Sequence, residues 1–203
     1  MQSLFAGYRR YRERRWPELR TLHDELATRG QRPSTLVIAC SDSRVDPATI
    51  FDADPGELFV VRNVANLAPT FEQAAHGYHG VSAAIEFAVT RLGVETILVL
   101  GHAQCGGVAA ALREEPRDPA SFVDRWVGLL ARAKARIAGR PGDPAALLEY
   151  ESIRVSLENL ATFPFVRAAM EERGLVLAGA RYGIADGILE LLDRATDRFV
   201  PLA

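Results

Sequence analysis

The chain has 203 residues, 48% of them hydrophobic and 25% charged, which is the balance of an ordinary globular protein that can bury a sizeable core. Its formal net charge of −2 excludes a strong field for nucleic acid or a membrane surface, and no apolar run approaches the roughly 18 residues of a membrane span. The first apolar residues precede the arginines, the reverse of a signal peptide, so we expect a cytoplasmic protein with neither nucleic acid nor a membrane among its partners.

Residues 2–30 are predicted to form two helices. An apolar stripe recurs at helical spacing along each of them: Leu4, Tyr8 and Tyr11, then Leu19, Leu22 and Leu26. Pro17 suits the first turn of the second helix, and Gly30 suits its carboxyl-terminal cap. Since an apolar stripe outside a main fold often packs on a partner subunit, we expect residues 1–32 to be a dimer-packing arm and residues 33–203 a single α/β domain.

From residue 34 onward, continuous apolar segments alternate with helical patterns. Strands are predicted at 34–39, 57–61, 96–100 and 175–178, and helices at 46–51, 81–92, 108–113, 118–137 (capped by Asp118), 145–161 and 164–173. The segment 187–192 fits either a short strand or a helix. This alternation predicts an α/β fold with a mostly parallel sheet, in which ligands bind beyond the carboxyl ends of the strands.

Polar groups follow two of these strands directly. Cys40, Asp42 and Arg44 come after the first buried strand, where charged groups are costly unless they are paired or bound to a metal. His102 and Cys105 come after the strand at 96–100, among glycines that let the backbone approach closely. Right-handed crossovers would bring both strand ends to the same edge of the sheet, so we expect these groups to meet.

Two thiolates and an imidazole match zinc in ligand type and number. Cys40, His102 and Cys105 would supply three ligands and leave a fourth position open, as in catalytic zinc sites. Asp42 could take that position itself and close the site. It could instead pair with the guanidinium of Arg44 and leave the position open. Both states are compatible with the sequence.

Five segments together resemble the β-class carbonic anhydrases, in order along most of the chain from about residue 31 to 192. They are Cys40-Ser-Asp-Ser-Arg44, Phe59-Val-Val-Arg62-Asn-Val64-Ala-Asn66, Gly101-His102-x-x-Cys105-Gly106-Gly107, Asn159-Leu-Ala-Thr-Phe-Pro164 and Tyr182-Gly-Ile184. The resemblance implies a four-stranded parallel core sheet with an antiparallel edge strand, flanked by helices. It also implies a homodimer or a higher even-numbered homo-oligomer.

The implied activity is the reversible hydration of carbon dioxide to bicarbonate and a proton by zinc-bound hydroxide, with one Zn²⁺ per chain. On the matching positions, Cys40, His102 and Cys105 are the zinc ligands, and Asp42 with Arg44 is the catalytic gating dyad. The residues expected to bind or enclose the substrate are Gln31, Phe59, Val64, Phe87 and Gly106, with Gln31 hydrogen-bonding the substrate and part of the apolar wall coming from the neighbouring subunit.

Two positions depart from family patterns. Plant-type members commonly have Tyr where this chain has Phe87, and the bicarbonate-inhibited bacterial subclass has Trp where this chain has Val37. With Gln31 present and the Trp absent, the sequence favours the plant-like, open-site subclass. Alternatives are a hydrolase of carbonyl sulfide or carbon disulfide on the same zinc scaffold, a non-catalytic zinc-binding regulatory module, and a Cys–His thiol nucleophile. The Asp42–Arg44 pair and Gln31 argue against the regulatory module, since a structural zinc needs neither.

Overall fold

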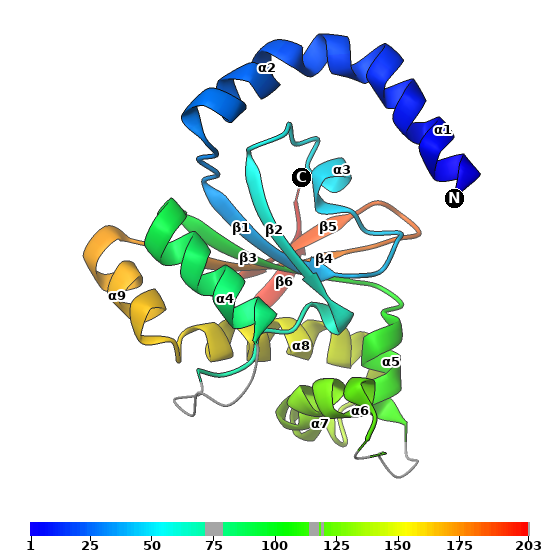
Figure 1. Cartoon of the computed structure of the whole chain (residues 1–203). Coiled ribbons are helices and arrows are strands. Elements are labelled where there is room, and N and C mark those ends of the chain that lie inside the picture. Colours follow the sequence, from blue (N-terminus) through cyan, green and yellow to red (C-terminus); the bar gives the residue numbers. More distant parts are fainter. Residues whose placement is uncertain (72–78, 114–117, 119, 203) are drawn as a thin grey trace.

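The computed structural model describes residues 1–71, 79–113, 118 and 120–202. At its centre is a six-stranded sheet with the order β2-β1-β3-β4-β5-β6 (Figure 1). The strands are β1 (Thr35–Cys40), β2 (Leu58–Asn63), β3 (Thr96–His102), β4 (Val176–Tyr182), β5 (Leu189–Asp193) and β6 (Arg198–Pro201). The first four are parallel, as predicted, and β5 pairs antiparallel with β4.

The antiparallel edge contains two strands where the sequence predicted one. The Asp193 carboxylate accepts hydrogen bonds from the backbone N–H of Ala195 at 2.9 Å and from the hydroxyl of Thr196 at 2.7 Å. These bonds close a turn that brings β6 back along β5. The ambiguous segment at 187–192 is therefore largely strand β5.

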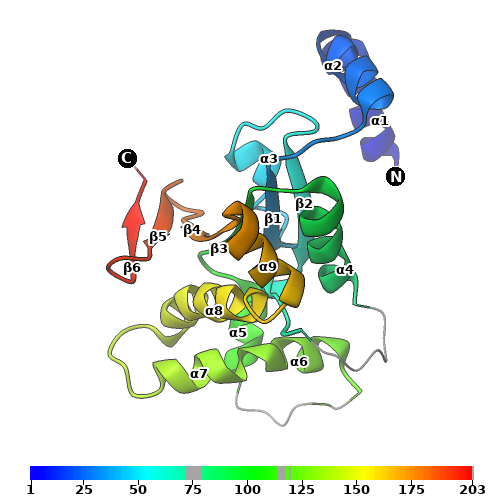
Figure 2. The same cartoon turned by 90° about the vertical axis from the view of Figure 1, so that its left-hand side faces the viewer.

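The amino-terminal segment is one helical arm without the predicted break. It consists of α1 (Gln2–Arg10), the π-helical η1 (Tyr11–Arg15) and α2 (Trp16–Arg29), and it ends at Gly30. Tyr11 and Trp16 keep helical backbone angles at the two junctions, so no loop separates the helices. No side chain of these three segments is buried, and the arm stands away from α5–α8 in both views (Figures 1 and 2).

Helices cover the sheet and its carboxyl end. They are α3 (Pro47–Ile50), η2 (Val64–Asn66), α4 (Gly80–Glu86), η3 (Phe87–Leu92), α5 (Gly106–Leu112), α6 (Phe122–Val127), η4 (Gly128–Leu130), α7 (Ala131–Ile137), α8 (Pro144–Leu160) and α9 (Pro164–Arg173). The prediction that Asp118 caps a long helix is wrong, because the hydroxyl of Ser121 accepts from the N–H of Asp124 and starts α6 there.

Helix α8 lies against the sheet because two glycines give it room. A Cβ at Gly101 of β3 would lie 2.8 Å from Cδ1 of Ile153, and a Cβ at Gly179 of β4 would lie 2.7 Å from Cγ2 of the same side chain. Ile153 is fully buried and belongs to the main core with the β1 residues Leu36 and Ile38. The close contact fixes α8 beside the strands whose ends carry the polar segments.

Strand β1 is buried on both faces, as its continuous apolar run predicts. Leu36 and Ile38 face the core beneath α8, whereas Val37 and Ala39 pack on the opposite face with Leu100. Among the described residues, no helix combines the length and apolar character that crossing a bilayer requires.

Candidate metal centre

The two polar segments meet at the carboxyl edge of the sheet. Cys40 is the last residue of β1 and His102 the last of β3, and these strands are hydrogen-bonded neighbours. Cys105 precedes the first turn of α5. The two sulfurs and a ring nitrogen of His102 lie within 4.8 Å of one another, and all three residues are buried.

The spacing of these atoms fits a zinc ion. The sulfurs of Cys40 and Cys105 are 3.9 Å apart, much longer than the roughly 2.05 Å of a disulfide. Two Zn–S bonds of about 2.3 Å at a tetrahedral angle would place them about 3.8 Å apart. Nδ1 of His102 lies 2.8 Å from the carbonyl of Ala103, which fixes its proton there and leaves the lone pair on Nε2.

Nε2 of His102 is buried and has no hydrogen-bond partner among the described residues. An unsatisfied buried polar atom is rare in a folded protein and needs an explanation, such as an ion at that point. The donor set and this orphaned nitrogen together show that the site could hold zinc.

The two thiols share one negative charge. The hydrogen bond from the Cys105 thiol is the largest of the effects that lower the pKa of Cys40 to about 4, against burial; the nearby His102 ring and the backbone N–H groups of Asp42 and Ala65 lower it further. The same hydrogen bond and burial raise the pKa of Cys105 far above its usual range. A divalent cation would replace the remaining proton and let both sulfurs be thiolates.

Asp42 and Arg44 form a bidentate pair beside this group. Nε of Arg44 donates to Oδ1 of Asp42 at 2.9 Å and Nη2 to Oδ2 at 2.7 Å, and the Arg44 N–H donates to Oδ1 at 2.9 Å. These bonds hold the pKa of Asp42 well below its usual range. Oδ2 lies 4.0 Å from Nε2 of His102, so an ionised carboxylate borders the ligand atoms.

Arg62 organises the loop after β1, a contribution that sequence reasoning missed. Its guanidinium donates to the carbonyls of Cys40 at 2.8 Å, Asp42 at 2.6 Å and Val45 at 3.1 Å. It also pairs with Asp46 at 3.2 Å. The available signal was an arginine at the end of an apolar strand, where its charge needs several partners.

Two of the five expected substrate residues lie near the metal group. A Cβ at Gly107 would lie 2.7 Å from Cγ1 of Val64, so Val64 borders the loop that carries Cys105. The indole N–H of Trp126 donates to the Val64 carbonyl at 2.8 Å and holds it there. A Cβ at Gly106 would meet no heavy atom within 4 Å, which leaves open space beside the loop.

The other three expected substrate residues, Gln31, Phe59 and Phe87, lie away from the metal group of their own chain. Phe59 and Phe87 stack with ring centroids 5.8 Å apart, and Phe59 pairs in register with Leu36, near the amino end of β1. Gln31 is exposed and precedes β1, whereas Cys40 ends it. The six residues of β1 alone span about 17 Å, so Gln31 and the Cys40 sulfur of one chain are far apart.

An apolar groove of about 610 Å³ adjoins Val64. It is lined by Val61, Arg62, Asn63, Val64, Gly80, Val81, Phe122, Val123 and Trp126. Phe122 is 83% exposed at its rim, a large apolar side chain with little protein around it.

Known proteins share both the sequence and this fold. A sequence model of the carbonic anhydrase family matches residues 35–189. Beta carbonic anhydrase 3 of Arabidopsis thaliana is 35% identical over 199 residues, which are 94% of this chain and 76% of the relative.

Solved structures of β-carbonic anhydrases also match this chain. The structure of the β-carbonic anhydrase CcaA matches with a TM-score of 0.89 at 30% identity, covering 100% of this chain and 92% of that one. A structure from a study of two tetrameric β-carbonic anhydrases of Sordaria macrospora matches with a TM-score of 0.77 at 28% identity, covering 100% and 95%. From its sequence, its fold and the site at the ends of β1 and β3, this chain belongs to the β-carbonic anhydrase family.

Proposed function

We propose that this chain is a carbonic anhydrase that interconverts carbon dioxide and bicarbonate, with one zinc ion held by Cys40, His102 and Cys105. The observation that carries the proposal is the convergence of these three ligand atoms around an orphaned Nε2. Zinc with three protein ligands lowers the pKa of water to about 7 and so supplies a nucleophile at neutral pH.

The chain's own residues orient that reaction. Arg44 keeps Asp42 ionised. The Asp42 carboxylate accepts a hydrogen bond from the attacking water and so orients the lone pair of the water oxygen toward the substrate. Carbon dioxide is uncharged, so the apolar side chain of Val64 and the open space at Gly106 suit it. Bicarbonate is charged, so this apolar surface favours it less than it favours carbon dioxide.

We propose that Asp42 stays paired with Arg44 at neutral pH, as in the plant-like, open-site subclass. The bidentate bond and the Arg44 N–H engage both carboxylate oxygens. Arg44 itself is anchored by the carbonyl of Gln104 at 3.1 Å, so the pair is fixed to the loop that carries His102 and Cys105. Val37, fully buried in β1, stands where the other subclass has Trp.

A second copy of the chain completes the site in this proposal. Gln31, Phe59 and Phe87 lie away from the metal group of their own chain, so we assign them to the site of a partner in a homodimer or a higher even-numbered homo-oligomer. We further propose that the arm of residues 1–32 packs on that partner through Leu4, Phe5 and Tyr8, which are exposed, and that residues 33–203 are the catalytic domain. Both cysteines are free, which suits a reducing, cytoplasmic setting.

Parallel measurements of zinc content and carbon dioxide hydration on the wild type and His102→Ala test the proposal. We expect about one zinc per wild-type chain, and loss of both zinc and hydration in the variant. A His102→Ala protein that keeps its hydration rate would contradict the assignment. Assays of carbon disulfide and carbonyl sulfide on the same samples would show whether the scaffold serves hydrolysis instead.

A further inference from the structure

A buried acid that the proposed reaction does not use lies behind the metal ligands. Glu149 of α8 is 4% exposed. Its Oε1 accepts a hydrogen bond from the backbone N–H of Cys105 at 3.4 Å. Its Oε2 accepts from Nη2 and Nε of Arg181 at 2.8 and 3.0 Å. A buried carboxylate is costly unless it is paired, so the pairing with Arg181 is what lets an acid stand here.

Arg181 connects this carboxylate to the sheet and to the surface. It lies on β4 opposite Gly101, next to Tyr182, which pairs in register with His102. Its Nη1 donates to Glu190 of β5 at 3.1 Å. The contacts therefore cross from α8 over β4, the neighbour of β3, to β5.

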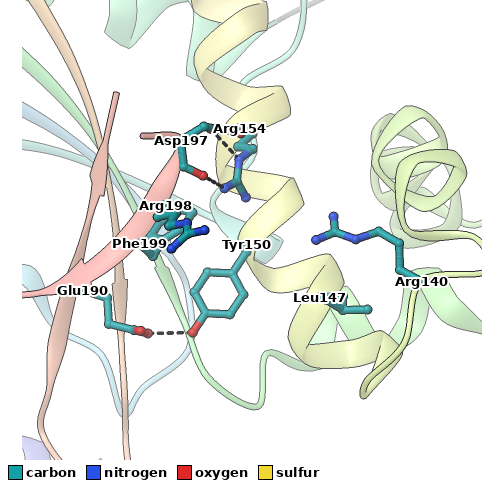
Figure 3. Close-up of a pocket in the computed structure, with 8 residues that line it drawn as sticks. All are labelled: Arg140, Leu147, Tyr150, Arg154, Glu190, Asp197, Arg198 and Phe199. Carbon is teal, nitrogen blue, oxygen red and sulfur yellow. Dashed lines mark hydrogen bonds and ion pairs between the residues drawn. The ribbon is translucent and has the colours of Figure 1, made fainter. Parts of the chain in front are cut away.

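Tyr150 closes the network at the surface. Its hydroxyl donates to Oε2 of Glu190 at 2.7 Å, and Figure 3 shows the ring standing between α8 and the edge strands in a pocket of about 320 Å³. Burial, and then the bond to Glu190, raise the pKa of Tyr150 to about 12, so the hydroxyl keeps its proton and remains a donor.

The peptide group between Gln104 and Cys105 is held at both ends. Its carbonyl, on Gln104, accepts from Nη2 of Arg44 at 3.1 Å, and its N–H, on Cys105, donates to Glu149 at 3.4 Å. Gln104 has a φ of 56°, a left-handed conformation that costs a non-glycine residue about 1 kcal/mol or more. Such a conformation persists only where the surroundings impose it.

We propose that Glu149 is a positioning residue for the metal ligand Cys105. Together with Arg44 it fixes the plane of the Gln104–Cys105 peptide, and Arg181 anchors its carboxylate. The sulfur of Cys105 is thereby placed at its distance from Cys40 before a metal binds. The proposal rests on the zinc site proposed above and adds to it a residue that touches neither metal nor substrate. Partners of this kind commonly change metal affinity by 10- to 100-fold.

The same helix offers a matched control. Glu151 is 6% exposed and lies two residues along α8, but it faces a different set of charges. Its carboxylate pairs with Arg140 and Arg154 at 3.5 Å and with Arg136 at 3.6 Å. None of these arginines contacts the metal loop in the described contacts. Neutralising Glu151 should therefore disturb a buried ion pair without moving Cys105.

The test compares Glu149→Gln with Glu151→Gln in the full-length protein. Zinc dissociation constants come from competition with a chelator, and the cobalt-substituted proteins report thiolate coordination by their charge-transfer absorption. We expect the zinc dissociation constant to rise about 10- to 100-fold in Glu149→Gln, with weakened thiolate absorption. Glu151→Gln should match the wild type in both. Thermal unfolding of the metal-free proteins shows whether Glu149→Gln and Glu151→Gln destabilise the fold to the same extent.

Two results would overturn the proposal: unchanged zinc affinity in Glu149→Gln, or an equal loss in Glu151→Gln, which would mean a general effect of removing a buried charge. If Glu149→Gln does not fold, Arg181→Lys can be used instead, because it keeps the positive charge but removes the paired hydrogen bonds from the guanidinium to Glu149. It should weaken zinc binding as well, and unchanged affinity would again refute the role. A wild type that binds no zinc would instead defeat the proposed function itself.

Discussion

The sulfur of Cys40 lies 3.9 Å from the sulfur of Cys105, although 65 positions separate the two residues in the chain. The parallel pairing of β1 with β3 accounts for this proximity, because it ends both strands at one edge of the sheet. Asp42 borders this group, Val64 packs against Gly107 beside Cys105, and Glu149 accepts from the Cys105 N–H.

Asp42→Asn should separate catalysis from metal binding. The amide is uncharged and keeps one acceptor oxygen instead of two, so it cannot pair with Arg44 in the same way and orients the attacking water poorly, while all three ligands remain. We expect hydration to fall by about 100-fold or more, in the usual range for a positioned acid or base, with zinc content unchanged. Stopped-flow hydration and metal analysis on one sample would measure both. Wild-type hydration in this variant would remove Asp42 from the mechanism.

Gly107→Ala should destabilise the protein. The new Cβ would lie 2.7 Å from Cγ1 of Val64 and 3.2 Å from the backbone N of Ala65, and the backbone cannot move away cheaply. Overpacking of this kind costs about 1–3 kcal/mol of unfolding free energy. Gly106→Ala is the control, because its Cβ meets nothing within 4 Å. Urea denaturation of both variants should show a loss only at Gly107, and equal stabilities would contradict the packing.

Tyr150→Phe should cost stability in a manner that depends on pH. The folded-state pKa of Tyr150, about 12, exceeds the ordinary value of 10.0, so the folded protein holds this proton more tightly than the unfolded chain does. The protonated Tyr150 hydroxyl therefore stabilises the fold fully below pH 10.0, and this stabilisation declines as the pH rises toward about 12.

We expect the wild type to be more stable than Tyr150→Phe by about 1 kcal/mol at neutral pH, and the difference to shrink above pH 10.0. Denaturant titrations at several pH values would measure it. If the stability difference between wild type and Tyr150→Phe grew with pH instead, the pKa of Tyr150 would not be raised in the folded protein.

Mixing two inactive variants should restore activity if Gln31 serves the partner's site. Gln31→Ala and Asp42→Asn each damage every site of their own homodimers. A mixed dimer has one site with both residues intact, because Asp42 comes from one chain and Gln31 from the other. Random exchange should therefore recover about a quarter of wild-type sites. Mixed dimers with no gain in hydration would mean that Gln31 does not act across subunits.

The chemistry and the main sheet could be predicted from sequence because each depends on local signals. Continuous apolar strands alternating with helices indicate parallel pairing, and parallel pairing brings Cys40 and His102 together. Their residue types then select zinc. The short helix after Asp46 was equally local: its carboxylate accepts from the N–H of Thr49, as the Asp-Pro pair predicts.

The remainder depends on contacts between distant or weakly patterned segments. Strand β6 has four residues that are mostly exposed, so no hydrophobic pattern marks it. Glu149 and Arg181 are 32 positions apart, and an acid on a helix ordinarily faces solvent. The arm was predicted as two helices because sequence spacing shows where helices are favoured but not whether their junction stays helical.

Titration of zinc into the metal-free protein, with carbon dioxide hydration followed at each addition, tests the central claim most directly. Hydration should rise in proportion to added zinc and level off at about one equivalent per chain. Binding of one equivalent without hydration at any pH from neutral to mildly alkaline would contradict the account.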